Sequence, residues 1–256
     1  MVIIIFVVAH WYTSLFFQSV FHHRYAAHGL FTMSKFLEKI FYWGCFITQG
    51  SSYISANTYG IMHRLHHAHT DTEEDPHSPS NTANVFTMMW QTRNNYFDIY
   101  KGKTLVEDKY RKDLPEWKWF EKYTHNFYAR FLWIAAYITF YYFFATEWWM
   151  WLFLPLTIVM GSLQGASVNW WAHRFGYVNF KMKNTSKNIM PVDFIFWGEA
   201  YHNNHHQFPG RANNATRWFE FDMGYGAMRL MDKLKMIKMK PAGLLPVPAV
   251  VPVANV

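Results

Sequence analysis

Residues 63–69 read HRLHHAH, which places four histidines in seven positions of a chain that has 14 histidines in 256 residues. Two further histidine-rich stretches are HHRYAAH at 22–28 and YHNNHH at 201–206. Neutral imidazole is a common ligand of iron, zinc, copper and nickel, so histidines gathered in this way point to a transition-metal site. The fold must therefore be one that can bring these three stretches together.

Helical spacing places several of these histidines on common faces. In an α-helix, residues three or four positions apart project from the same side. The same rule applies to NWWAH at 169–173, where an asparagine and a histidine are four apart at the end of an apolar stretch. The sets expected to share a face are His63, His66 and His67; His202, His205 and His206; and Asn169 with His173.

The stretch 22–28 does not follow this rule. His23 and His28 are five positions apart, which is about 140° around an ideal α-helix. They can point at one site only if the helix ends or distorts between them, and Gly29 directly afterwards is compatible with a helix end. We therefore expect an end or a distortion of the helix at this pair.

The number of motif histidines predicts two metal ions. One ion takes roughly four to six ligands, whereas two adjacent ions with four or five imidazoles each would use nine. A structural zinc site would more often recruit cysteines, and Cys45 is the only cysteine in the chain. Histidines that merely form polar caps near a membrane would not be expected to form three such clusters. The nine candidate ligands are His23, His28, His63, His66, His67, His173, His202, His205 and His206.

Composition indicates a membrane protein. Hydrophobic residues make up 51% of the chain, aromatics 21% and charged residues only 16%, and Trp and Tyr favour the boundary between lipid and water. Residues 2–21 are uncharged and long enough to span a bilayer, and they lack the basic start and cleavage site of a signal peptide. Residues 127–145 and 148–172 predict a helical hairpin, with Pro155 as a candidate kink. The expected fold is all-α, with three or four membrane crossings.

Two polar segments, 57–126 and 173–240, are expected to form a mainly helical cytosolic cap within a single domain that extends over 1–240. Nine of the 24 Lys and Arg residues lie in the first segment and eleven in 173–256, so the positive-inside rule places both segments on the cytoplasmic side. We interpret this charge as a sign of membrane topology and of attraction to lipid headgroups, rather than as a sign of nucleic-acid binding. The proline-broken end, 241–256, is expected to be disordered.

The stretch 36–56 is apolar but interrupted by charged and small polar residues. If it crossed the membrane, the histidine stretches 22–28 and 63–69 would lie on opposite faces, and they could not share a site. We therefore expect an interfacial or re-entrant segment against the cytoplasmic leaflet. Labelling of Cys45 from each side of the membrane would test this expectation.

Three of these motifs resemble a known family. HRYAAH, HRLHH and HNNHH, with two apolar segments between the second and the third, look like the three histidine boxes of integral-membrane fatty acid desaturases. The resemblance is greatest to the acyl-CoA, stearoyl-type Δ9 branch and its bacterial members. His202 opens the third box, where front-end desaturases have Gln. The resemblance extends to DTEEDPHSP (71–79), NWWAH (169–173) and WGEAYHNNHHQFP (197–209).

The resemblance implies an enzyme that uses O₂ to introduce a cis double bond into a saturated acyl chain, carried by CoA or by a lipid, at a non-haem di-iron centre. The nine histidines would hold the two irons, and Asn169 would contact one of them through water. Family members commonly have four membrane helices, whereas only one fits before His23, which predicts three crossings and an external N-terminus. Because imidazole ligands are usually oriented by outer hydrogen bonds, we expect Glu199, Asn203, Asn204 and His77 around the ligands. Candidate residues lining the acyl chain are Gln164, Trp170 and Trp171.

No second redox centre is recognisable in the sequence, so electrons are expected from a separate protein. A ferredoxin, a flavoprotein reductase or a cytochrome b5-like protein would dock on the basic cap, where an acidic partner is favoured. Two alternatives remain open. A fatty acid or alkane hydroxylase on the same di-iron scaffold would have the same histidines. A membrane metal transporter would place ligands near the bilayer midplane between internal repeats, and no internal repeat is found.

Overall fold

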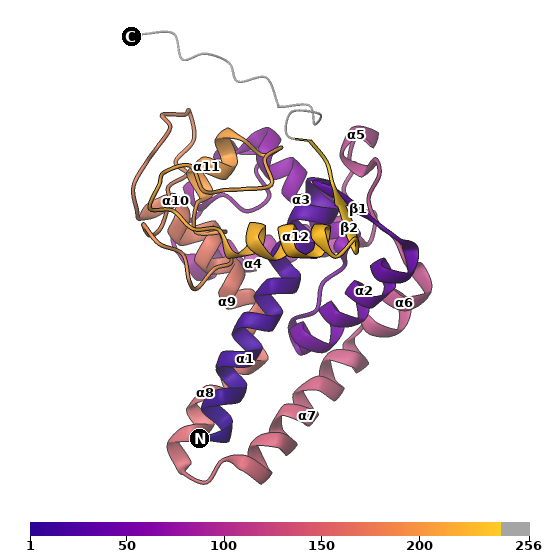
Figure 1. The fold of residues 1–256 in the computed structure, drawn as a ribbon. Coiled ribbons are helices and arrows are strands. Elements are labelled where there is room, and N and C mark those ends of the chain that lie inside the picture. Colours follow the sequence, from indigo (N-terminus) through magenta and orange to yellow (C-terminus); the bar gives the residue numbers. More distant parts are fainter. Residues whose placement is uncertain (242–256) are drawn as a thin grey trace.

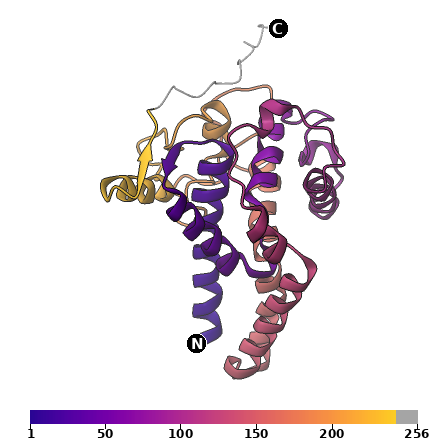
Figure 2. The ribbon, with the colours of Figure 1, turned by 90° about the vertical axis from the view of Figure 1, so that its right-hand side faces the viewer.

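The protein consists of a helical cap and a stalk of apolar helices that projects from it (Figure 1). This computed structural model describes residues 1–241, so the predicted disordered tail, 241–256, lies outside the described residues except for Pro241. The stalk contains α1 (Val2–Phe17), α7 (Phe127–Phe144) and α8 (Phe153–Ile158). Viewed from the side, the α1 rod and the α7 hairpin both point away from the cap (Figure 2). The prediction of a mainly helical protein is confirmed.

The first apolar stretch forms a longer helix than 2–21. Helix α1 continues directly into η1 (Gln18–Ala27), a π-helix, and Val2–Ala27 is the one unbroken helix among the described residues that is long and apolar enough to cross a membrane. A bent pair, Trp148–Ile158 with Met160–Arg174, passes the same test as one broken span. Three or four crossings therefore stay a prediction.

The second arm of the expected hairpin bends, but not at Pro155. The arm contains η4 (Trp148–Leu152), α8, α9 (Met160–Ala166), η5 (Ser167–Trp171) and α10 (Ala172–Arg174). Its two halves meet at 67° across Val159. Pro155 lies in the first turn of α8, where backbone N–H groups have no helical partner and proline is tolerated. The break follows one turn later.

Helix α2 (Lys35–Gln49) has apolar side chains on two opposite faces. It begins at Ser34, whose hydroxyl accepts a hydrogen bond from the Leu37 N–H, a common N-cap arrangement. The inner face packs into the cap core, where the Cys45 side chain has no solvent exposure. The outer face exposes large apolar side chains at helical spacing: Phe36, Ile40, Trp43 and Ile47. This outer face suits the predicted interfacial segment, which stays a prediction.

The rest of the cap surrounds η1 with short helices. Ser55 caps α3 (Ala56–His69), the helix that carries HRLHHAH. The cap also contains a two-stranded antiparallel sheet, in which Phe31 pairs with Met239, and isolated β-bridges such as that between Tyr177 and Asn188. The remaining cap elements are β1 (Phe31–Met33), η2 (Gly50–Ser52), η3 (Pro79–Asn81), α4 (Val85–Tyr100), α5 (Asp108–Arg111), α6 (Lys118–Thr124), α11 (His202–Gln207), α12 (Met223–Lys233) and β2 (Ile237–Met239).

An aromatic core fixes η1 against α2 and α6. Phe21 of η1 is fully buried and packs on Phe41 and Tyr42 of α2, and Tyr42 in turn contacts Phe120 of α6. Each such aromatic pair adds about 0.5–1.5 kcal/mol beyond its buried area. The cap core therefore holds the histidine-bearing end of the first apolar helix in place.

Candidate metal centre

The backbone of η1 explains how two histidines five positions apart face one point. The His28 N–H donates to the His23 carbonyl at 3.1 Å, the i→i+5 hydrogen bond of a π-helix. This widened turn brings residues i and i+5 onto one side of the helix, and the two Nε2 atoms lie 3.2 Å apart. The expected distortion is a π-helix. Such helices are rare and occur frequently at functional sites.

Five histidines from three elements form a first group. Their Nε2 atoms make a closed ring in which each atom lies 2.9–3.2 Å from two neighbours. Helix α3 contributes two members, the π-helix contributes His23 and its C-cap residue His28, and α11 contributes one. In order around the ring they are His23, His28, His63, His67 and His205.

The other four histidines form a second group. Their Nε2 atoms make an open chain with neighbouring separations of 3.2, 3.0 and 3.0 Å. The ring of His67, from the first group, lies 4.5 Å from the ring of His206, from the second. The two groups are therefore adjacent. The members of the second group are His66, His206, His202 and His173.

The nitrogen positions fit bound ions better than mutual hydrogen bonds. A neutral Nε2 carries either one hydrogen or one lone pair, so five such atoms can make at most two hydrogen bonds among themselves. Two nitrogens that each lie about 2.1 Å from one metal ion, with a right angle between their bonds, are about 3 Å apart. This separation matches the 2.9–3.2 Å observed. The donor set thus suits one ion in each group.

His66, His63 and His205 are in the protonation state that binds metal. Burial, together with a smaller effect of the neighbouring His173, lowers the pKa of His66 to about 3. Burial and the mutual proximity of the rings lower the pKa values of His63 and His205 well below the usual range. At neutral pH these side chains are uncharged and have a lone pair free for a metal.

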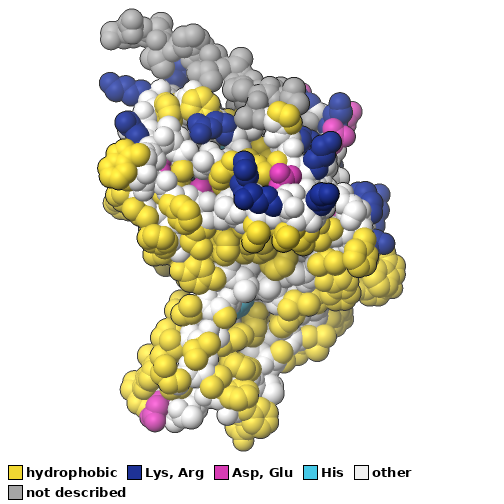
Figure 3. Space-filling model, in the orientation of Figure 1, with side chains coloured by type: hydrophobic (Ala, Val, Ile, Leu, Met, Phe, Trp, Pro, Cys, Tyr) yellow, Lys and Arg dark blue, Asp and Glu magenta, His cyan; other side chains and the backbone are white. Residues whose placement is uncertain are grey.

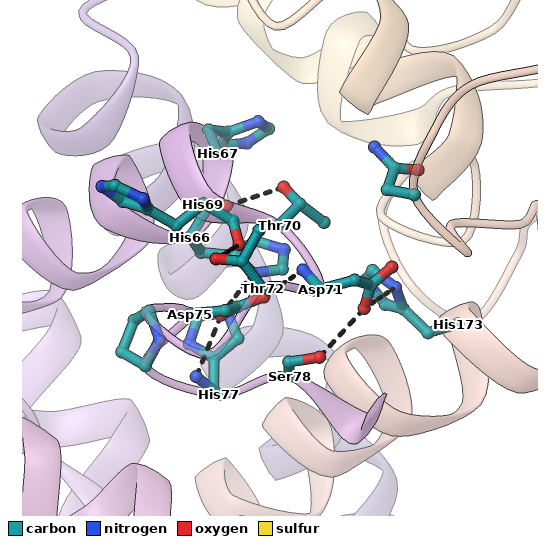
Figure 4. A network of polar contacts seen from close by, with 12 residues as sticks. His66, His67, His69, Thr70, Asp71, Thr72, Asp75, His77, Ser78 and His173 are labelled. Atoms are coloured by element: carbon teal, nitrogen blue, oxygen red, sulfur yellow. Dashed lines mark hydrogen bonds and ion pairs between the residues drawn. The ribbon is translucent and has the colours of Figure 1, made fainter. Parts of the chain in front are cut away.

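Carboxylates orient histidines of both groups through Nδ1. Glu199 Oε2 lies 2.7 Å from His23 Nδ1, and Asp75 places both carboxylate oxygens 2.9 Å from His66 Nδ1. His173 Nδ1 lies 3.1 Å from Thr185 Oγ1 and 3.6 Å from Asp71 Oδ1. Such partners fix the ring so that Nε2 faces the metal. Figure 4 shows Asp75 between His66 and His77, and Asp71 beside His173.

Asp71 and Asp75 were not predicted as functional residues from the sequence. Both belong to DTEEDPHSP, the stretch directly after α3. Asp75 also accepts from the backbone N–H groups of Asp71 and His77, so it holds this loop against the histidine helix. The density of carboxylates right after a histidine helix is the signal that could have indicated them.

Glu199 is held by groups that are themselves buried. Ser19 donates to Glu199 Oε1 at 2.5 Å, and Arg24 Nε lies 3.6 Å from the same oxygen. Arg24 is 1% exposed and also donates to both Asp222 oxygens, at 2.9 and 3.0 Å. Gly198 permits this packing, because a Cβ there would lie 2.1 Å from Asp222 Oδ1, and its φ is +89°. Glu199 therefore has a fixed position beside His23.

Asn203 and Asn204 do not contact the imidazole N–H groups, contrary to expectation. Asn203 Oδ1 accepts from the backbone N–H groups of Asn179 and Phe180. Asn204 Nδ2 donates to Glu220 Oε2 at 2.8 Å. On a helix, positions 203 and 204 face away from 202, 205 and 206. Both asparagines anchor α11 to neighbouring loops and so support its three histidines.

The other expected residues lie around the site with different contacts. The ring of His77 packs 4.2 Å from the ring of His66, while neither of its buried nitrogens has a hydrogen-bond partner within residues 1–241. Asn169 is half-buried in η5, one turn before His173. Its predicted contact with a metal through water stays a prediction.

The three residues expected to line an acyl chain lie between the stalk and the cap. Gln164 is buried and donates to the Trp11 carbonyl while accepting from Ser14, so it ties α9 to α1. Trp170 packs beneath the Arg174 guanidinium at 4.5 Å. Trp171 is 42% exposed. Their contact with substrate stays a prediction.

Comparison with known proteins assigns the family. A family model described as fatty acid desaturase matches residues 1–225. The chain is 29% identical to the Delta-9 desaturase-like 5 protein of Arabidopsis thaliana (83% of this chain, 68% of the relative) and 28% identical to Delta-9 acyl-lipid desaturase 1 of the same plant (84% and 67%). It is 27% identical to sn-1 stearoyl-lipid 9-desaturase of Synechocystis sp. (84% and 64%). The chain belongs to the fatty acid desaturase family and is an oxidoreductase that desaturates fatty acyl chains.

Proposed function

We propose that this desaturase holds two irons, one in each histidine group, and uses O₂ to place a cis double bond in a saturated acyl chain at a Δ9-like position. The observation that carries the proposal is the division of nine imidazole Nε2 atoms into adjacent groups of five and four. When bound, a pair of irons supplies the oxidising chemistry that removes hydrogen from an unactivated methylene, which redox-silent zinc does not supply. Fe²⁺ is compatible with imidazole ligands.

The overall reaction needs electrons from outside the chain. One CH₂–CH₂ unit, O₂, two electrons and two protons give one CH=CH unit and two waters. The protein's own part is to orient the imidazoles through Glu199 and Asp75 and to place the acyl chain beside them. A separate donor protein, such as a ferredoxin, a flavoprotein reductase or a cytochrome b5-like protein, supplies the electrons.

The acyl carrier is a lipid rather than CoA in this proposal. The sequence motifs favoured acyl-CoA, but the names of two relatives describe an acyl-lipid desaturase and a stearoyl-lipid desaturase. A membrane lipid would approach from the stalk side, where the first apolar helix leads directly into the π-helix that carries His23. Analysis of the lipid products identifies both the acyl carrier and the position of the double bond.

The stalk forms the membrane part of the molecule in this proposal, with three crossings and the metal centre on the cytoplasmic side. Most exposed side chains along α7 are apolar, including Phe131, Leu132 and Phe143. Figure 3 shows hydrophobic side chains over the stalk and over a band at the base of the cap, with Lys and Arg above this band. This order matches lipid tails, interface and headgroups, and the positive-inside rule then places the cap in the cytoplasm.

Expression in a desaturase-deficient host, followed by gas chromatography of the fatty acids, tests the function. A new cis monoene is expected from the wild-type chain. The His66→Ala variant should yield none and should bind less iron, whereas His69→Ala is the matched control. His69 belongs to the same stretch but pairs with Glu74 and lies in neither group. A hydroxy fatty acid would identify the rival hydroxylase, and unchanged turnover of His66→Ala would refute the metal assignment.

A further inference from the structure

Asp193 is a buried carboxylate outside the two histidine groups. Its side chain has no solvent exposure, and a buried charge is costly unless nearby polar groups compensate it. Every hydrogen bond that its carboxylate accepts within residues 1–241 comes from a backbone N–H group, two to each oxygen. The donors to Oδ1 are Ile195 at 3.0 Å and Phe196 at 2.6 Å, and the donors to Oδ2 are Gly198 at 2.7 Å and Ala200 at 3.3 Å.

These hydrogen bonds shape the loop that carries Glu199. All four donors lie in 195–200, so a single carboxylate bonds to the loop on both sides of Trp197. Trp197 has a φ of +57°, a left-handed conformation that is uncommon for a residue with a side chain. Such a conformation persists only where the surroundings hold it. Asp193 therefore fixes the backbone on which Glu199 is placed.

Two side chains of α1 hold the same loop from the other side. Trp11 Nε1 donates to the Ile195 carbonyl at 3.0 Å, and the Tyr12 hydroxyl donates to the Phe194 carbonyl at 2.8 Å. Helix α1 continues directly into the π-helix η1. The loop is therefore held in register with the histidine-bearing end of the same continuous helix.

We propose that Asp193 is a positioning residue for the group of five histidines, because it holds Glu199 where this carboxylate directs His23 at the metal. The inference rests on the proposed function, since it concerns one of the two proposed iron sites. Glu199 Oε2 lies 2.7 Å from His23 Nδ1, and outer partners of this kind set the orientation and the basicity of a metal-bound imidazole.

The effect of Asp193 is confined to one site. Within residues 1–241, neither Asp193 nor Glu199 forms a hydrogen bond or an ion pair with a histidine of the group of four. That group has its own carboxylates, Asp75 at His66 and Asp71 at His173. A change at Asp193 should thus weaken one metal site and leave its neighbour unchanged, which a general loss of folding would not do.

Cobalt titration of the metal-free protein distinguishes the two groups. Imidazole is a ligand of divalent first-row metals, and the visible absorption of Co²⁺ depends on the number and arrangement of its ligands. His28→Ala and His202→Ala each remove a ligand from one group and so assign the absorption bands. Asp193→Asn is then compared with Asp71→Asn, whose carboxylate lies beside His173 in the group of four.

Asp193→Asn should lower the cobalt affinity of the group of five roughly 3- to 10-fold, which is less than the factor of about 10 to 100 for loss of a direct carboxylate partner. The band of that group should also shift, while the band and the affinity of the group of four stay as in the wild type. Asp71→Asn should give the reverse pattern. Equal losses in both groups of Asp193→Asn would overturn the proposal, and so would unchanged bands and affinities in both.

Tyr12→Phe provides the test if Asp193→Asn does not fold. This variant keeps the aromatic ring and removes one exposed hydrogen bond to the loop. It should shift the group-of-five band in the direction expected for Asp193→Asn and lower the affinity of that group roughly 2-fold. A spectrum and a titration identical to those of the wild type would, in that case, overturn the proposal.

Failure of the proposed function gives a different result from failure of this inference. A wild-type chain that binds one cobalt ion in each group, but forms no monoene when it is loaded with iron, would refute the proposed function and leave the role of Asp193 intact. A wild-type chain that binds no cobalt at these histidines would refute the proposed metal site before any variant is compared.

Discussion

His23 and Glu199 form a direct contact between the first histidine stretch and the residue that precedes the third, with His23 Nδ1 at 2.7 Å from Glu199 Oε2. Burial by itself would raise the pKa of Glu199, but His23, Arg24 and Ser19 outweigh this and lower it. The carboxylate therefore stays charged and keeps the His23 Nε2 directed at the group of five.

Neutralising this carboxylate should weaken iron binding without unfolding the cap. Loss of an outer carboxylate partner typically costs about 10- to 100-fold in metal affinity, so Glu199→Gln should reduce iron affinity by that factor. Glu38→Gln is the matched control, because Glu38 is 5% exposed and bonds to Tyr25 and Lys35 rather than to a histidine. Iron titration of metal-free protein checks both, and equal losses in the two variants would show a general folding effect instead.

His77 should be dispensable as a ligand although it lies against one. Its ring packs on His66, and with His66 and Asp75 it forms a third cluster of possible ligands, but it belongs to neither of the two groups that contain the nine histidines. His77→Phe keeps an aromatic ring in this buried position and should retain two irons per chain, whereas His66→Phe should lose iron. Metal analysis of both purified variants tests this prediction. Loss of iron from His77→Phe would show that the His77 ring binds the metal directly.

Glu121 should make the cap less stable as the pH rises. Burial raises its pKa to about 7 from its ordinary value of 4.5, although the hydrogen bond from Ser55 partly opposes this shift. The folded state thus holds a proton that the unfolded state releases, so stability is full below about pH 4.5 and is lost as the pH rises towards 7. The loss is up to about 3 kcal/mol, since one pKa unit corresponds to about 1.4 kcal/mol.

Thermal unfolding in detergent between pH 5 and 8 measures this dependence. The wild-type melting temperature should fall as the pH rises, and Glu121→Gln should remove that part of the fall, since an amide does not titrate. Identical pH profiles for the two proteins would show that Glu121 titrates normally.

The outer face of α2 should lie in the lipid interface on the cytoplasmic side. Cys45 is fully buried, so it should resist thiol reagents from either side in the folded protein and cannot report topology. With Cys45 replaced by Ser, a spin label at Trp43→Cys or Ile47→Cys should give shallow immersion depths in a bilayer. Values typical of the bilayer centre would show that α2 crosses the membrane.

Helical periodicity was sufficient to predict most of the candidate site. His63, His66 and His67 share a face because they are three or four apart on a regular helix, and the structure places all three in the two groups. The same periodicity, applied to 203 and 204, would have directed those asparagines away from the metals. The π-helix at His23 could not be derived, because its i→i+5 hydrogen bonds depend on how η1 packs on α2 and α3.

Sequence patterns could not predict the contacts that the loops make. Glu199 could be anticipated because it adjoins a histidine stretch, whereas Asp71 contacts Thr185 and His173 only after two distant segments pack together. The bend at Val159 likewise differs from the expected kink at Pro155, because proline is harmless in a first helical turn. Local rules predict which residues share a face, and tertiary packing decides which loops meet them.

Anomalous diffraction at the iron edge, on crystals of the purified protein, tests the central claim most directly. We expect two peaks per chain, one within the group of His23, His28, His63, His67 and His205 and one within the group of His66, His173, His202 and His206. A single peak, or iron bound away from these imidazoles, would contradict the two-iron site.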